Sequence, residues 1–253
     1  DQPIVLRFSP LDDAANITVS PPANPSFPIQ TVAVPAFGTG TIDLTNWIDD
    51  IENTPFNTVL PQGLLVSSDA SINAYYEVNH GLNPDIFALK GSSALGQEFY
   101  IPFQTYLNNG YLESKAGIDI VATSDNTEIT IIPTQNLTGY TAGNPITITL
   151  DAGETYALRA ANAAANQHPS GTYISSSAPI AVTVSDDSIV GTPYNGSCMD
   201  LLGDQVIPVQ VAGSEYIAIK GNLNGPDKIF LVGTADNTSV SVDGTYVWTL
   251  GAG

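Results

Sequence analysis

The chain repeats itself, and this internal duplication constrains its fold more than any single motif does. Residues 171–187 (GTYISSSAPIAVTVSDD) resemble residues 63–79 (GLLVSSDASINAYYEVN), with one offset of 108 residues from Gly63 to Gly171 and from Ile72 to Ile180. In each copy, runs of alternating apolar and polar residues flank a short polar segment, the pattern expected of a β-hairpin with one buried face. The sequence therefore predicts two duplicated β units.

A second repeated motif carries the tripeptide Asp-Asn-Thr. It occurs in residues 117–133 (GIDIVATSDNTEITIIP) and again in residues 228–242 (KIFLVGTADNTSVSV), where it predicts another hairpin. Residues 145–158 (PITITLDAGETYAL) follow the first of these, and residues 250–253 (LGAG) begin a further copy. We expect a first unit over residues 1–116 with a degenerate N-terminal hairpin, and a second over residues 117–228. Residues 229–253 would start a third unit or supply closing strands.

Glycine, proline, asparagine and aspartate bound the strand-like runs throughout the chain. This pattern predicts an all-β fold of two sandwich-like units in tandem. Pairing between the N-terminal and C-terminal strands would instead give a propeller-like closed repeat. Position 1 is not methionine, which predicts a processed or excised piece.

The two copies differ in length after the repeated hairpin. Residues 96–99 (GQEF) match residues 213–216 (GSEY) at an offset of 117, so the second copy holds about nine extra residues within positions 188–204. An insertion in one copy is where a specific function is often added, although a drifted loop explains it equally well. The candidate ligand contacts there are Tyr194, Asn195 and Asp200.

The charge balance excludes some partners. The chain has 25 acidic and 6 basic residues, a formal net charge of −19. Such an excess repels phosphate backbones and anionic lipids, so we expect no nucleic acid partner. No apolar run approaches the roughly 18 residues that a membrane span requires, so we expect no membrane insertion. The charge itself is typical of a soluble extracellular protein.

Candidate catalytic groups are few. A hydrolase needs a nucleophile, a base and an orienting group, and the histidines His80 and His168 lie in predicted loops. A Cys198–His168 dyad and the carboxylate pairs Asp49–Asp50, Asp186–Asp187 and Asp200–Asp204 are the remaining combinations. Acidic residues this frequent occur together by chance, so we expect no enzyme.

The acidic residues suit calcium better than catalysis, because calcium prefers hard oxygen ligands from loops. Asp186, Asp187, Asp200 and Asp204 are the candidate ligands if the ends of the second unit converge. The alternative is that these carboxylates lie at strand ends and face water.

Aromatic side chains could bind sugar rings by stacking. Tyr75 and Tyr76 are adjacent, so on a strand one of them must face outward. Trp248 is a further candidate. Tyrosines on strands are more often half-buried packing residues, which is the alternative reading.

Several of these runs resemble the IgGFc-binding protein N-terminal domain family. They are residues 151–158 (DAGETYAL), 171–187, 200–209 (DLLGDQVIPV) and 213–219 (GSEYIAI), and the resemblance covers roughly residues 32–242. It implies a secreted, multi-domain, non-enzymatic protein. The single cysteine and the few basic residues look more like the surface proteins of Bacteroidota, which include gliding and adhesion proteins exported by the type IX pathway, than like animal mucus proteins.

We therefore expect a non-catalytic segment of a large secreted bacterial adhesin or filament at the cell surface. It would mediate adhesion or act as a rigid spacer. Its partners would be other domains of the same protein and a surface glycan or protein ligand. The alternatives are a carbohydrate-binding module and a polysaccharide-acting enzyme.

Overall fold

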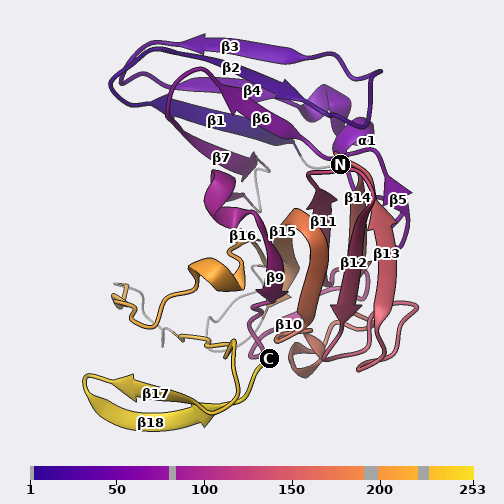
Figure 1. Cartoon of the computed structure of the whole chain (residues 1–253), viewed down its shortest axis with the longest axis vertical. Coiled ribbons are helices and arrows are strands. Elements are labelled where there is room, and N and C mark those ends of the chain that lie inside the picture. Colours follow the sequence, from indigo (N-terminus) through magenta and orange to yellow (C-terminus); the bar gives the residue numbers. More distant parts are fainter. Residues whose placement is uncertain (1–2, 80–83, 191–198, 222–227) are drawn as a thin grey trace.

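The computed structural model describes residues 3–79, 84–190, 199–221 and 228–253 (Figure 1). It is 47% strand and 7% helix, which confirms the all-β class. Within the described ranges the strands form two sandwiches of stacked sheets and a separate C-terminal hairpin, not the radial blades of a propeller.

The first sandwich packs two sheets face to face. Their strand orders are β4-β1-β7-β8 and β3-β2-β6. The elements are β1 (Ile4–Pro10), β2 (Ala15–Ser20), β3 (Gln30–Val34), β4 (Gly40–Asp43), η1 (Thr45–Trp47), α1 (Ile48–Ile51), β6 (Leu65–Ser68), β7 (Ile72–Val78) and β8 (Asp85–Leu89). Alternate residues point between the sheets, so that Leu6, Phe8, Ile17, Val19 and Leu44 are buried in one core.

The second sandwich is one long sheet folded over its own core. Its main strand order is β13-β12-β15-β11-β14-β5, and β9, β10 and β16 also pair with β15. The elements are β5 (Val59–Leu60), η2 (Gly91–Ala94), β9 (Gly96–Tyr100), β10 (Asn108–Asn109), β11 (Ala116–Ala122), β12 (Thr127–Ile132), β13 (Ile146–Leu150), β14 (Thr155–Arg159), η3 (Ala165–Gln167), β15 (Tyr173–Val190), β16 (Asp200–Val206) and η4 (Val209–Val211).

Strand β15 belongs to both layers of this sandwich. Its first part pairs with β12 and β9, and its second part pairs with β11, β16 and β10. The register with β9 shifts between Ser175 and Ile180. The expected hairpin over residues 171–187 is therefore wrong, because its two halves form one continuous strand.

The other predicted hairpins are also wrong. The N-terminal one is split, because β1 and β2 lie in different sheets, and in residues 228–242 only residues 238–242 form a strand, which pairs with residues 245–250. Strands β6 and β7 pair with β2 and β1 instead of each other, and β11 and β12 both pair with β15. The short turns occur near the predicted places, with Asn126 at φ 54°, but they carry the chain from one sheet to the opposite one. Period-two alternation identifies a strand with a buried face. It does not show whether the next turn stays within one sheet or crosses to the opposite sheet, because both kinds of turn keep that face in the core.

The pairing registers show that the two sandwiches are copies. In the first, Ile17 lies opposite Ser68 and Phe8 lies opposite Ala74. In the second, Ile129 lies opposite Ser176, and Ile120 lies opposite Val182. The matching positions are those that the sequence repeat aligns.

A further copy of one strand pair is present at the C-terminus. Strands β17 (Thr238–Val242) and β18 (Thr245–Leu250) place Thr238 opposite Leu250, as β12 and β13 place Thr127 opposite Leu150. The pair lies apart from both sandwiches in Figure 1. Neither of its strands joins a sheet with any other described strand.

Two sets of contacts join the sandwiches. On one side the side chain of Asn53, which follows α1, accepts from Thr155 Oγ1 at 2.6 Å and donates to Asp119 Oδ1 at 3.2 Å. On the other side the backbone N–H of Lys90 donates to Gln205 Oε1 at 2.5 Å. The ammonium of Lys90 also forms an ion pair with Asp204. These contacts hold the two sandwiches at both ends of their interface.

Candidate functional site

A cavity of about 350 Å³ lies between the two sandwiches. The first sandwich supplies mostly apolar residues to its wall, including Val66, Tyr76 and Leu89. The second supplies both apolar residues and polar ones, the latter including Asp119 and Arg159. Cavities of this size at an interface between domains are common ligand sites.

An ion pair and two unpartnered oxygens give the cavity its polarity. Arg159 Nη1 lies 3.2 Å from Asp119 Oδ1. Among the described residues, the buried atoms Asp85 Oδ2 and Gln62 Oε1 have no hydrogen-bond partner. Burial raises the pKa of the Asp85 carboxyl above its ordinary value, because it disfavours the charged form. The site is therefore suited to a group that brings N–H or O–H donors.

Aromatic rings form part of the apolar wall. Tyr76 stacks on Phe87 with ring centroids 5.2 Å apart, and both residues line the cavity. Burial also raises the pKa of the Tyr76 hydroxyl, so this group is neutral at physiological pH. The neighbouring Tyr75 points to the opposite face and is exposed, which confirms that one of the two tyrosines faces outward.

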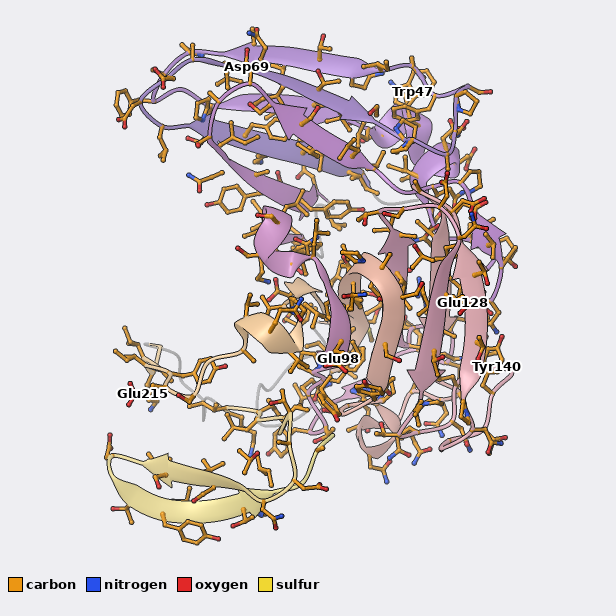
Figure 2. All side chains as sticks on the ribbon, in the orientation of Figure 1. Trp47, Asp69, Glu98, Glu128, Tyr140 and Glu215 are labelled. Atoms are coloured by element: carbon orange, nitrogen blue, oxygen red, sulfur yellow. The ribbon has the colours of Figure 1, made fainter. Side chains whose placement is uncertain are left out.

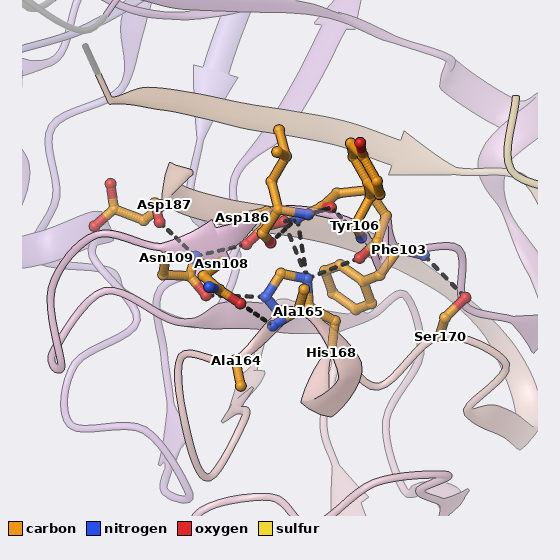
Figure 3. Close-up of polar contacts among 12 residues, drawn as sticks. Phe103, Tyr106, Asn108, Asn109, Ala164, Ala165, His168, Ser170, Asp186 and Asp187 are labelled. Carbon is orange, nitrogen blue, oxygen red and sulfur yellow. Dashed lines mark hydrogen bonds and ion pairs between the residues drawn. The ribbon is translucent and has the colours of Figure 1, made fainter. Parts of the chain in front are cut away.

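A second cluster, buried in the second sandwich, is built around His168 (Figure 3). Its Nδ1 lies 2.8 Å from the carbonyl oxygen of Gln104 and 3.4 Å from Asp186 Oδ2, and its Nε2 lies 3.0 Å from Asn109 Oδ1. Asp186 accepts hydrogen bonds from Gln104 Nε2 at 2.8 Å and from Asn109 Nδ2 at 2.7 Å.

This cluster has the features of a structural network. His168 is 2% exposed and Asp186 is 3% exposed, so neither side chain is accessible to a substrate. Both ring nitrogens lie within hydrogen-bond distance of oxygen atoms, so the buried imidazole has a partner at each nitrogen. Burial raises the pKa of Asp186 despite the opposing effects of His168 and the two amide donors. The cluster ties β10 and the segment around η3 to β15.

The candidate contacts of the insertion lie mostly outside the described residues. Tyr194 and Asn195 are among these, as is Cys198 of the proposed dyad. Asp200 begins β16 with an exposed side chain. The ligand-binding role of the insertion therefore remains a prediction.

The four candidate calcium ligands have separate surroundings. Asp186 belongs to the His168 cluster, and Asp204 pairs with Lys90. Asp187 follows Asp186 on β15, where successive side chains point to opposite faces. The described residues contain no group of three or more His, Cys, Asp or Glu side chains that could hold a metal ion. The calcium site stays a prediction, supported by net charge alone.

The sequence pointed to Tyr76 of the cavity and to His168 and Asp186 of the buried cluster, each in another role. The other residues of both sites were missed. One signal was available, because Asp119 and Arg159 are charged residues inside otherwise apolar strands, β11 and β14. Such positions often carry a partner. For Gln104 and Asn109 the sequence offered no signal, because amide residues are common in loops.

These features define a class before any comparison is made: an all-β protein of duplicated sandwiches with a cavity between them. Residues 86–253 match the IgGFc binding protein family, so the chain belongs to this family. The family indicates a binding-type domain that is secreted or lies at the cell surface. Helices in the described part of the chain are too short or too polar to cross a membrane.

Comparisons with individual proteins add little. No curated protein matches the chain. Among solved structures, the chain is similar to Bacteroides uniformis beta-glucuronidase 2 covalently bound to cyclophellitol-6-carboxylate aziridine, at 10% identity and a TM-score of 0.16. The match covers 82% of this chain and 24% of the glucuronidase. A TM-score this low carries no argument about fold or function.

Proposed function

We propose that the chain is a non-catalytic segment of a large secreted surface protein, in which it acts as a rigid spacer and mediates adhesion. Membership of the IgGFc binding protein family supports a binding-type role outside the cell. Export by a type IX pathway and a part in bacterial gliding are finer proposals, and they rest on the resemblance of the repeated runs.

The observation that carries the spacer role is the double connection between the sandwiches. Asn53 bonds to Thr155 and Asp119 at one end of the interface, and Lys90 contacts Asp204 and Gln205 at the other. Two separated points of contact resist hinge motion more than one linker does. Stacked β units of this kind lengthen a surface protein and place few demands on its sequence.

The adhesive role needs a protein or glycan ligand. The family takes its name from binding of the Fc part of IgG, which makes Fc the first protein ligand to test. For glycans, the exposed rings of Tyr75 on β7 and Trp248 on β18 are the described candidates for stacking, and Tyr75 is tested first. This is the observation behind the carbohydrate-binding alternative.

The test is a binding and turnover experiment on the intact chain. Immobilised protein is exposed to Fc fragments and to a glycan array, and soluble protein is incubated with a panel of fluorogenic glycosides that includes glucuronides. We expect saturable binding to one ligand class and no glycoside turnover above that of a heat-denatured sample.

Two variants separate the ligand classes. Tyr75→Ala should abolish glycan binding if that ring is the platform, whereas the matched exposed-ring control Tyr111→Ala should not. Binding to Fc should survive both substitutions. Turnover by the native chain, or absence of binding to every protein and glycan tested, would contradict the proposal.

A further inference from the structure

One turn occurs three times in the chain, each time after the second strand of a pair. Its central residue is Phe37 after β3, Gly153 after β13 and Gly253 after β18, with left-handed φ values of 57°, 82° and 83°. In each copy the backbone N–H of this residue donates to a backbone carbonyl at 2.9–3.0 Å, and the acceptors are Leu11, Ala122 and Gly233. We call these three repeat equivalents the left-handed turns.

The left-handed turn at Gly153 lies against the first sandwich. Strand β13 runs toward that sandwich (Figure 1), and Gly153 O accepts a hydrogen bond from the backbone N–H of Gly63 at 3.0 Å. A Cβ added at Gly63 would lie 2.6 Å from this oxygen, and a Cβ added at Gly153 would lie 2.8 Å from the backbone nitrogen of Ala23. Neither position has room for a side chain, so the two backbones approach each other through glycine.

The same contact recurs between the second sandwich and the C-terminal hairpin. Gly171 is the repeat equivalent of Gly63. A Cβ added at Gly171 would overlap the carbonyl carbon of Gly253, and a Cβ added at Gly253 would lie 2.8 Å from Gly171 O. The hairpin of β17 and β18 therefore meets the second sandwich at the repeat position where the second sandwich meets the first.

The turn conformation does not by itself require glycine. Phe37 holds the same left-handed conformation with a side chain that is 77% exposed. Such a conformation is uncommon for a residue with a side chain, but it is accessible. The close approach of the first sandwich, in addition to the turn, therefore explains why position 153 is glycine.

A backbone contact of this kind is well suited to set an angle between two units. Gly153 lies two positions before Thr155, whose hydroxyl bonds to Asn53, so both contacts lie at the same end of the interface. A long side chain such as that of Lys90 can change its rotamer while its partner moves. Two backbones in direct contact cannot move in this way, and an added methyl group must push the units apart.

We propose that each sandwich carries a docking surface for the left-handed turn of the next unit, and that this contact sets the angle between the two units. The docking surface lies around Gly63 and Ala23 in the first sandwich and around Gly171 in the second. The partner that fits is a turn whose left-handed residue is glycine, because a side chain at that position would meet the backbone of the docking surface. This inference deepens the proposed spacer role and rests on it.

Three alanine variants separate the contact from the strain of the turn. Gly63→Ala adds a methyl group at the contact, at a position without a left-handed φ. Gly153→Ala adds a methyl group at the contact and also strains the turn. The matched control Gly143→Ala adds the strain alone, because Gly143 has a φ of 77° and a Cβ added there meets nothing within 4 Å.

Distances between pairs of spin labels measure the angle. In a Cys198→Ser background, labels at Thr31→Cys on β3 and Glu128→Cys on β12 report between the sandwiches, and Figure 2 shows Glu128 on the second of them. Labels at Glu128→Cys and Asp200→Cys report within the second sandwich. Labels at Glu128→Cys and Ser241→Cys on β17 report between the second sandwich and the hairpin.

The contact variants should change the distance between the sandwiches and nothing else. Gly63→Ala and Gly153→Ala should each displace the mean distance by more than the native width, or at least about double that width. The double variant should move it no further than Gly63→Ala alone, because both substitutions break one contact. Gly143→Ala should leave it unchanged. The distance within the second sandwich should stay the same in every variant, which shows that this sandwich is still folded.

Gly171→Ala applies the same test to the hairpin, and it should change the hairpin distance but not the distance between the sandwiches. Three results would overturn the proposal and leave the spacer role standing. They are a narrow distance between the sandwiches that neither contact variant changes, an effect of Gly143→Ala as large as that of Gly153→Ala, and a hairpin distance that Gly171→Ala leaves unchanged. A native distribution that is broad before any substitution would contradict the spacer role and this inference with it.

Discussion

At the scale of single residues, the buried cluster around His168 shows how this fold handles a charge in its interior. Asp186 is placed where water cannot reach it, and two amide side chains and an imidazole replace the lost hydration. The two amide partners, Gln104 and Asn109, lie 82 and 77 positions away in sequence. A charge held in this way stabilises the fold only while all its partners remain.

Truncation of Asp186 should therefore be costly. Asp186→Ala leaves His168 and the amide donors of Gln104 and Asn109 buried without their acceptor, and we expect a loss of about 3–5 kcal/mol in the free energy of unfolding. Urea denaturation followed by circular dichroism measures it. The control Asp200→Ala removes an exposed carboxylate and should change the free energy by less than about 0.5 kcal/mol. Equal effects of the two substitutions would show that the cluster is not a stabilising network.

At the scale of elements, β9 shows that a strand can lie before the expected boundary of a unit and still belong to its core. Residues 96–100 precede the expected boundary at residue 116, yet they pair with β15 of the second sandwich. Their repeat equivalent, residues 213–220, joins no sheet among the described residues. Truncating the equivalent aromatic residue in each copy therefore shows whether its contribution to stability depends on its burial.

Phe99→Ala and Tyr216→Ala form this matched pair. Phe99 is fully buried, so its truncation should leave a cavity and cost about 3–5 kcal/mol. Tyr216 is exposed, and its truncation should cost less than about 0.5 kcal/mol. Thermal or urea unfolding at low protein concentration measures both. A large loss at Tyr216, or a small one at Phe99, would contradict the placement of β9.

The sequence could predict which elements exist but not which of them pair. The repeat, the all-β class and the turn near Asn126 follow from local patterns of alternation and turn residues. The partners of β6, β7, β11 and β12 do not, because a turn within a sheet and a turn between sheets bury the same face. The site shows the same limit: Asp186 stands out as an acid in sequence, whereas its amide partners become visible only after folding.

At the scale of the whole molecule, the account rests on the two sandwiches acting as one rigid body. Asn53 links β11 and β14 to the first sandwich on one side, and Lys90 contacts β16 on the other. A rigid body of this kind fixes both the distance and the orientation between the parts of the protein that it connects, as a spacer must.

The distance distribution between spin labels on the two sandwiches tests this claim most directly. In a Cys198→Ser background, labels at Thr31→Cys on β3 and Glu128→Cys on β12 report across the interface, and both positions are exposed. Labels at Glu128→Cys and Asp200→Cys report within the second sandwich and serve as the reference. We predict a single inter-sandwich distance whose distribution is as narrow as the reference. A distribution several times broader, or two separate distances, would contradict the rigid spacer.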